Sequence, residues 1–363
     1  MKSSMSNRLW HRLKFLLLGI LAVSLVVGCQ PQPPESQAPA TVGTPAPTPI
    51  TLNGAGASFP LLFYTRLFGE YNKLHPDVFI NYQDIGSAAG VQQMIAATVD
   101  FGASDIAMTD DEIAQVAQGV VLVPMTAGSV AVAYNLPGLE SGLRLSQTAY
   151  TDIFLGEITQ WNDPAIAATN PGAPLPDLPI ILVHRSDGSG TTAVLTAHLS
   201  AISPKWEEAV GTGLNVAWPA GVGIKSNAGV SAQIQQAEGA IGYVEYSYAK
   251  KLGLSIAALE NQAGNFVEPN TEAVKAGLSE VEFGDDLRGF VPNPASPEAY
   301  PLVTYTWLLL FETYDDPTKA ETIKGVVQWG LTEAQGFSEE LGYVPLPEAV
   351  VEKAMQAVER IMP

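Results

Sequence analysis

The chain has 363 residues, of which 47% are apolar and 15% are charged, and its formal net charge at neutral pH is −19. This composition excludes general disorder and predicts sizeable buried cores, and the length predicts two domains. The acidic balance argues against nucleic acid as a partner. A small anion would have to be bound by local dipoles and hydrogen bonds, because the overall field repels it.

The first 28 residues have the architecture of a signal peptide. An apolar stretch at 15–27, short for a membrane-spanning helix, follows a basic run. The basic run consists of Lys2, Arg8, Arg12 and Lys14. Cleavage after residue 28 would remove these four basic residues and no acidic one, so the remaining chain would carry a net charge of −23. We therefore expect the mature protein to lie outside the cytoplasm.

Cys29 is the single cysteine of the sequence and follows Val26-Val27-Gly28. This segment resembles a bacterial lipobox, in which cleavage before the cysteine frees its amine and thiol for acylation; the alternative is a fortuitous cysteine in an ordinary signal peptide. A single cysteine excludes internal disulfides and cysteine-based metal clusters. Residues 29–50 are rich in Pro, Ala, Thr and Gln and lack an apolar period, which is typical of an extended tether.

From Ile50 onward, short β-rich runs alternate with amphipathic helical stretches, which predicts an α/β fold. The expected elements are a strand at 50–53, a helix at 60–74, a strand at 78–85, a helix containing Val91, Met94 and Ile95, a strand at 99–104, and a helix opened by a capping box of Thr109 and Glu112. Ser58, Ser87 and Asp105 each follow one of these strands, beside the start of a helix. Because ligands of open α/β sheets bind outside the carboxyl ends of the strands, these side chains are expected to converge. Each taken by itself is equally explained as an N-cap or turn residue.

Two long apolar runs are expected to connect two lobes. The run at 120–135 leaves the first lobe and enters the second, and the run at 301–311 returns. The first lobe then comprises 51–126 and 303–363, and the second comprises 127–302. Each lobe is predicted to be a mixed sheet flanked by helices, with two hinge crossovers between the lobes.

The segment Arg185-Ser186-Asp187-Gly188-Ser189-Gly190-Thr191 follows a predicted strand at 180–184 and precedes a predicted helix. Its glycines permit close backbone approach to a ligand, and the helix start offers unpaired N–H groups and a positive dipole end. Arg185 supplies a planar guanidinium that matches an oxyanion. The alternative is a glycine-rich turn in which Arg185 merely pairs with Asp187.

Two other glycine-rich turns do not match known nucleotide motifs. The turn at 53–60 (NGAGASFP) fails as a dinucleotide fingerprint because Phe59 stands where the third glycine is required, and 221–226 (GVGIKS) lacks the spacing of a P-loop.

Six motifs in a fixed order are similar to those of the phosphate-binding protein of the phosphate-specific ABC importer. They are NGAGASFP, IGSAAGV, VDFGASDIAMTD, FLGEITQWNDPAI, HRSDGSGTT and GAIGYVEY, and the resemblance runs from about Thr51 to the C-terminus. It implies a two-lobed periplasmic-binding-protein-like α/β fold of type II. It also implies a monomeric binding protein rather than an enzyme, with no cofactor or metal. The implied partners are inorganic phosphate and the membrane permease subunits of an ABC importer, and the membrane is contacted only through a lipid anchor at Cys29.

The resemblance also implies a set of ligand-binding residues. These are Ser58, Phe59, Ser87, Asp105, Arg185, Ser189, Gly190 and Thr191, with Asp187 orienting Arg185. Asp105 is expected to accept a hydrogen bond from the proton that phosphate retains near neutral pH, whereas sulfate would leave two acceptors facing each other. Because the donors come from both lobes, phosphate is expected to favour a closed form.

Three other functions compete with this interpretation. A binding protein for sulfate or molybdate is disfavoured by Asp105. A phosphate sensor or scavenger that feeds no importer has the same expected site. A serine hydrolase would use Ser189 as nucleophile with His184 or His198 as base, but Gly188-Ser189-Gly190 is not the G-x-S-x-G elbow.

Overall fold

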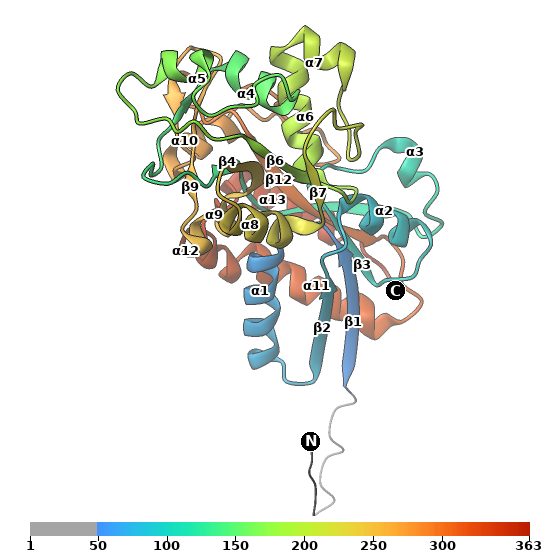
Figure 1. The fold of residues 1–363 in the computed structure, drawn as a ribbon. Coiled ribbons are helices and arrows are strands. Elements are labelled where there is room, and N and C mark those ends of the chain that lie inside the picture. The colour runs from blue at the N-terminus through green and yellow to red at the C-terminus, as the bar shows by residue number, and fades with distance from the viewer. Residues whose placement is uncertain (1–48) are drawn as a thin grey trace, which may run out of the picture. The chain divides into compact units, whose positions relative to one another are not determined.

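The computed structural model describes residues 49–363, which lie in one compact α/β unit (Figure 1). The predicted signal peptide, Cys29 and nearly all of the predicted tether lie outside the described residues. Ile50, the last residue assigned to the tether, already begins the first strand. No helix within 49–363 has the length and apolar composition needed to cross a membrane.

Within residues 49–363 the strands form a large sheet of nine strands and a small sheet of three. From one edge to the other, the large sheet contains β2 (Val78–Gln83), β1 (Ile50–Gly56), β3 (Phe101–Ser104), β12 (Val303–Phe311), β4 (Val120–Tyr134), β8 (Ala240–Glu245), β6 (Ile181–Arg185) and β7 (Val222–Ile224), with β9 (Ser255–Ile256) also paired to β4. The small sheet contains β11 (Phe266–Val267), β10 (Ala258–Glu260) and β5 (Arg144–Leu145).

Helices surround both halves of the large sheet (Figure 1). Those of the chain's two ends are α1 (Leu61–Leu74), α2 (Ser87–Ile95), α3 (Asp110–Ile113), α11 (Pro317–Leu331), the 3-10 helix η1 (Glu333–Phe337), α12 (Ser338–Leu341) and α13 (Glu348–Val358). Those of the middle of the chain are α4 (Gln147–Phe154), α5 (Pro164–Thr169), α6 (Gly190–Ile202), α7 (Pro204–Ala209), α8 (Ser226–Gln236), α9 (Tyr246–Leu252) and α10 (Thr271–Leu278).

The long strand β4 belongs to both halves of the large sheet and joins them. Its residues 120–129 pair antiparallel with β12, and residues 130–134 pair antiparallel with β8. Every residue of β4 and β12 is buried, which explains why both appear in the sequence as continuous apolar runs.

This topology brings the ends of distant strands together. Ser104, the last residue of β3, pairs with Trp307 of β12, which in turn pairs with Pro124 of β4. Glu245, the last residue of β8, pairs with Val130 of β4. Strands β3 and β8 run in opposite directions, because three antiparallel pairings separate them. Their carboxyl ends therefore face each other over the middle of β4, and the loops that follow them meet there.

The predicted elements are present, with shifted ends. Helix α1 begins at Leu61, with Pro60 as its N-cap rather than inside the first turn. The capping box of Thr109 and Glu112 is confirmed at the start of α3. Helix α1 packs against α11 and η1 as well as the sheet, and its buried residues are Phe63, Tyr64, Leu67, Phe68 and Tyr71.

Candidate oxyanion site

The turn between β1 and α1 directs the Ser58 hydroxyl toward Asn227 at the start of α8. Gly56 has a φ of +149°, and a Cβ there would lie 2.0 Å from the carbonyl oxygen of Ala103, so only glycine lets β1 approach β3 this closely. Two tyrosines hold the turn from outside. Tyr248 donates to the Ser58 carbonyl (2.8 Å) and Tyr343 donates to the Phe59 carbonyl (2.6 Å). The turn is thereby fixed with both Ser58 and Phe59 buried.

Ser87 begins α2 and connects two other predicted site residues. Its Oγ accepts a hydrogen bond from the N–H of Gly190 (3.1 Å) and a longer one from the N–H of Asp105 (3.3 Å). At the same junction, the Ala88 N–H donates to the Gly188 carbonyl (3.0 Å). The starts of α2 and α6, which are about a hundred residues apart in sequence, are therefore in direct contact.

Asp105 is a buried carboxyl group, 1% exposed, at the point where β3 ends. Its Oδ1 accepts a hydrogen bond from the Thr306 hydroxyl of β12 (2.9 Å). Burial raises the pKa of Asp105 to about 7, even though the Thr306 bond and the positive charge of Arg185 act to lower it. Near neutral pH this carboxyl group therefore exists both as the acid, which donates a hydrogen bond, and as the carboxylate, which only accepts one.

Arg185, at the end of β6, is held in a fixed orientation by Asp187. Its Nε donates to Oδ1 (2.7 Å) and its Nη2 donates to Oδ2 (2.5 Å) of Asp187, and its Nη1 lies 3.5 Å from the Thr191 hydroxyl. Burial acts to raise the pKa of Asp187, but the bonds from Arg185 and from the Ser226 N–H (3.2 Å) outweigh it and lower that pKa from its ordinary value. The guanidinium is buried as part of an ion pair, with its Nη1 directed away from Asp187.

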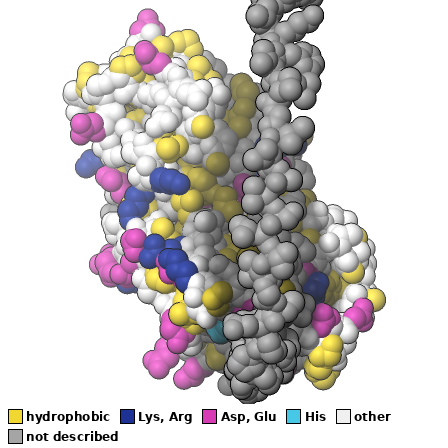
Figure 2. All heavy atoms as spheres, turned by 90° about the horizontal axis from the view of Figure 1, so that it is seen from below, with side chains coloured by type: hydrophobic (Ala, Val, Ile, Leu, Met, Phe, Trp, Pro, Cys, Tyr) yellow, Lys and Arg dark blue, Asp and Glu magenta, His cyan; other side chains and the backbone are white. Residues whose placement is uncertain are grey.

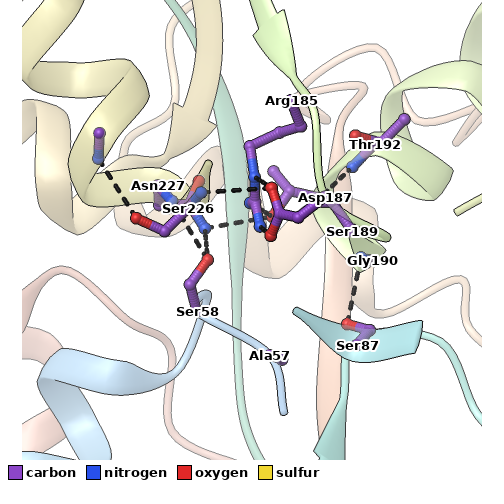
Figure 3. Close-up of polar contacts among 12 residues, drawn as sticks. Ala57, Ser58, Ser87, Arg185, Asp187, Ser189, Gly190, Thr192, Ser226 and Asn227 are labelled. Carbon is purple, nitrogen blue, oxygen red and sulfur yellow. Dashed lines mark hydrogen bonds and ion pairs between the residues drawn. The ribbon is translucent and has the colours of Figure 1, made fainter. Parts of the chain in front are cut away.

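The start of α6 supplies the remaining predicted residues. Ser189 is the N-cap, and its Oγ accepts from the N–H of Thr192 (3.2 Å). A Cβ on Gly190 would lie 2.6 Å from the Cβ of Asp105, so glycine is needed for the helix start to meet the Asp105 loop. In Figure 3, Ser58 and Ser87 lie on one side, and Arg185, Asp187 and Asn227 face them from the other.

Two residues of this cluster, Asn227 and Thr306, were missed in the sequence. Asn227 lies in the first turn of α8, and its amide nitrogen Nδ2 donates to the hydroxyls of Ser58 (3.0 Å) and Thr191 (3.2 Å). The segment before it, 221–226, does not match a P-loop, and its strand β7 is followed directly by Lys225, the N-cap of α8. Thr306 is a polar residue within an apolar strand, which is a usable signal for a buried functional contact.

The histidines and Ser189 do not form a hydrolase-like arrangement. His184 Nδ1 lies 2.9 Å from the Arg185 carbonyl, and its ring stacks on Trp218. His198 Nε2 lies 2.7 Å from the Tyr150 hydroxyl, and burial lowers its pKa to about 4. Ser189 Oγ caps its own helix instead of contacting either ring. Among residues 49–363, no group of three or more His, Cys, Asp or Glu side chains has a geometry that would hold a metal ion.

On the face drawn in Figure 2, Lys and Arg side chains are interspersed with Asp and Glu side chains. They form no continuous basic surface there that would attract an anion. Ion pairs of the surface include Lys73 with Glu70 (2.9 Å) and Lys275 with Glu339 (3.1 Å). An anion at the cluster would be held by the buried donors described above, because the net charge of −19 gives no overall attraction.

A second buried carboxyl group, Glu245, lies at the end of β8, where it caps α9 and accepts the Ser247 N–H (2.9 Å). Burial raises its pKa to about 8. A folded-state pKa above the unfolded value stabilises the fold at low pH, and this contribution is lost as the pH rises through about 7 for Asp105 and about 8 for Glu245.

We expect the ligand-free protein to lose thermal stability between pH 5 and pH 8.5, and the Glu245→Gln variant to lose less of it. The reason is that the free energy of unfolding falls by about 1.4 kcal/mol per pH unit for each such carboxyl group, between its unfolded-state pKa and its raised folded-state pKa. Thermal unfolding midpoints of the two proteins, measured in parallel across this range, check the prediction. Parallel curves would show that Glu245 does not titrate there.

Comparison with known proteins places this chain in a family. A model of the PBP superfamily domain matches residues 35–334. The phosphate-binding protein PstS of Pasteurella multocida is 42% identical over 306 residues, which cover 84% of this chain and 88% of that protein. The chain belongs to the PstS family of phosphate-binding proteins.

Other members of the PstS family cover even more of the chain. PstS of Xylella fastidiosa is 37% identical over 350 residues, covering 93% of this chain and 95% of that protein. Among solved structures, a phosphate-binding protein from Stenotrophomonas maltophilia has the same fold with a TM-score of 0.66, covering 85% of this chain and 94% of that one at 19% identity. The predicted family resemblance and the predicted type II periplasmic-binding-protein fold class are thereby confirmed.

Proposed function

We propose that this protein binds inorganic phosphate outside the cytoplasm and delivers it to the permease subunits of an ABC importer, without catalysing a reaction. The observation that carries the proposal is Asp105, a buried hydrogen-bond acceptor within a cluster of hydroxyl, N–H and guanidinium donors. A tetrahedral oxyanion that retains a proton complements both kinds of group. The names of the PstS relatives, which describe phosphate-binding proteins, support the same ligand.

The ligand is held by the residues that the sequence motifs indicated. Ser58, Ser87, Ser189 and Thr191 donate through hydroxyls, Phe59 donates through its backbone N–H group, Arg185 donates through its guanidinium, and Asp105 accepts. Gly190 contacts the ligand at the start of α6, where its N–H also donates to Ser87 Oγ (3.1 Å). A micromolar site requires roughly 8 kcal/mol, and each hydrogen bond to a charged group contributes about 1.5 to 3 kcal/mol. Several such donors are sufficient even after the entropy lost on association.

Phosphate stabilises a closed arrangement of two lobes, one comprising 51–126 and 303–363 and the other comprising 127–302. This division is supported by β4 and β12, which connect the two halves of the large sheet, and by the contacts of Ser58 and Ser87 with residues of the middle of the chain. An importer then recognises the closed form. Small-angle scattering profiles that are identical with and without phosphate would contradict closure.

The mature protein is a monomer anchored by acylated Cys29 in the periplasm or at the outer face of the cytoplasmic membrane. This proposal is supported by the lipobox-like Val26-Val27-Gly28-Cys29 sequence and by the Pro-rich segment after it. Mass spectrometry of the mature protein is expected to detect acyl chains on Cys29. Their presence in a Cys29→Ser variant would contradict the assignment.

We expect calorimetric titration to give micromolar or tighter binding of phosphate and no measurable binding of sulfate at equal concentration. Arsenate, which retains a proton as phosphate does, serves as the matched ligand. Equal binding of phosphate and sulfate would favour a general oxyanion-binding protein, including one for molybdate. Phosphate uptake that is unchanged after deletion of the gene would favour the sensor or scavenger function.

A further inference from the structure

The Asn227 side chain joins the two sides of the oxyanion site and is completely buried. Its Oδ1 accepts the N–H of Glu245 (2.9 Å), which is an obligate donor, so the orientation of the amide is determined. Its Nδ2 must then face the hydroxyls of Ser58 and Thr191, at 3.0 Å and 3.2 Å. The amide therefore acts as a hydrogen-bond donor to both hydroxyls.

These bonds decide what the two hydroxyls are able to do. Ser58 Oγ accepts from both the Nδ2 and the backbone N–H of Asn227 (3.1 Å), which occupies its two lone pairs. Thr191 Oγ1 accepts from Asn227 and, at 3.5 Å, from Nη1 of Arg185. Within residues 49–363 neither hydroxyl donates a hydrogen bond to another protein group. Each hydroxyl therefore retains an O–H group that has no acceptor in the protein.

The backbone before Asn227 holds this arrangement in place. Ser226 has a φ of +60°, a left-handed conformation that is unusual for a residue other than glycine, asparagine or aspartate. In this conformation its N–H donates to Asp187 (3.2 Å), while the next N–H, that of Asn227, reaches Ser58. The first turn of α8 thus supports both the Arg185–Asp187 pair and the Ser58 hydroxyl.

We propose that Asn227 is a positioning residue that makes the Ser58 and Thr191 hydroxyls obligate donors to the anion. The proposal rests on the proposed function, because it requires phosphate oxygens as acceptors. The site then recognises two different features of its ligand. The Ser58 and Thr191 hydroxyls need a hydrogen-bond acceptor, and the Asp105 carboxylate needs a hydrogen-bond donor. The ligand must supply both, as a partly protonated oxyanion does.

The test compares Asn227→Asp with Asn227→Leu by titration with inorganic phosphate. The aspartate side chain keeps one oxygen for the Glu245 N–H but offers the other as an acceptor to the two hydroxyls, so both are turned away from the ligand. We expect the phosphate Kd to rise by about 100-fold or more at pH 8 for Asn227→Asp, and by about tenfold for Asn227→Leu, which removes the donor without adding charge.

Two readouts separate positioning from a merely structural role. As the pH falls from 8 to 5.5, the introduced carboxyl group takes up a proton and donates again, so the ratio of the Asn227→Asp Kd to the wild-type Kd should narrow, whereas the ratio for Asn227→Leu should stay constant. In a Ser58→Ala/Thr191→Val background, Asn227→Leu should weaken binding by less than about threefold, because its effect passes through those hydroxyls.

The outcomes distinguish this inference from the function on which it rests. If wild-type protein binds no phosphate, the proposed function fails and the inference fails with it. If wild-type protein binds phosphate and folded Asn227→Asp and Asn227→Leu bind it within about threefold of wild type, only the inference fails. Losses that are pH-independent and fully additive with Ser58→Ala/Thr191→Val would also overturn it. Circular dichroism and the unfolding midpoint without phosphate establish that each variant is folded.

Discussion

Replacement of Asp105 by asparagine is expected to reduce the preference for phosphate over sulfate by about 10³-fold or more. The carboxylate of the wild-type protein faces a bound sulfate with no proton between the two groups, and a site built around such a hydrogen bond rejects an analogue without the donor by about 10⁴ to 10⁵. The asparagine amide has nearly the same size and presents an N–H group to either anion. We therefore expect the loss of preference to come mainly from a gain in sulfate affinity, measured by calorimetric titration with both anions at pH 8.

The matched control for Asp105→Asn is Asp316→Asn. Asp316 is exposed and is the N-cap of α11, where it accepts from the Thr318 N–H (2.8 Å), and asparagine is an equally good N-cap. This variant makes the same change in net charge and should leave the preference as it is in wild type. An unchanged preference in folded Asp105→Asn would remove the proposed role of Asp105.

Replacement of Arg185 by methionine is expected to weaken phosphate binding by about 10³-fold or more. Truncating one member of a buried hydrogen-bonded charge pair typically costs 2 to 5 kcal/mol or more, and part of that loss comes from the charge left behind. Here the remaining charge is Asp187, which would lose both bonds from the guanidinium, keep the Ser226 N–H (3.2 Å) and its own backbone N–H, and repel the incoming anion. The double variant Arg185→Met/Asp187→Asn should therefore bind phosphate more tightly than Arg185→Met.

Arg288→Met provides the matched control for the arginine variant. Arg288 makes the same kind of paired contact, with Asp286 (2.5 Å) and Asp110 (2.6 Å), but its side chain is 32% exposed, and its other contact is a bond to the Met108 carbonyl (3.3 Å) rather than to a residue of the cluster. We expect its phosphate Kd to stay within about twofold of wild type, because exposed ion pairs contribute little. If Arg185→Met also binds within tenfold of wild type, the guanidinium does not contact the anion.

How far the sequence could predict this site depends on whether a residue's partner is close to it in the chain. The pairing of Arg185 with Asp187 and the helix that follows are local, and the segment 185–191 indicated a helix after it and left the pairing open as one of two alternatives. The contacts of Ser87 with Gly190 and of Asp105 with Thr306 join residues 103 and 201 positions apart. No local pattern reports such a pairing. The rule for the carboxyl ends of strands connected Ser87 with Asp105, and the family resemblance connected both with Gly190.

Asn227 shows why part of the site was not predicted. In the sequence it lies at a helix start soon after a strand, as Ser58 and Ser87 do, but asparagine at a helix start is common and usually satisfies only its own backbone. Its role depends on Glu245, whose N–H decides which way the amide faces, and on two hydroxyls from distant turns. These relations exist only after β4 has aligned the two halves of the sheet.

The sequence by itself determined the α/β alternation, the buried strands β4 and β12, the glycine-bearing turns and the family, since periodicity, turn chemistry and motif order are local properties of the chain. The tertiary structure decided which turns meet, which hydroxyls retain a free O–H group, and the pKa of Asp105, about 7. Those properties depend on desolvation and on directed contacts between residues far apart in sequence, which arise only when the carboxyl ends of opposed strands are brought face to face.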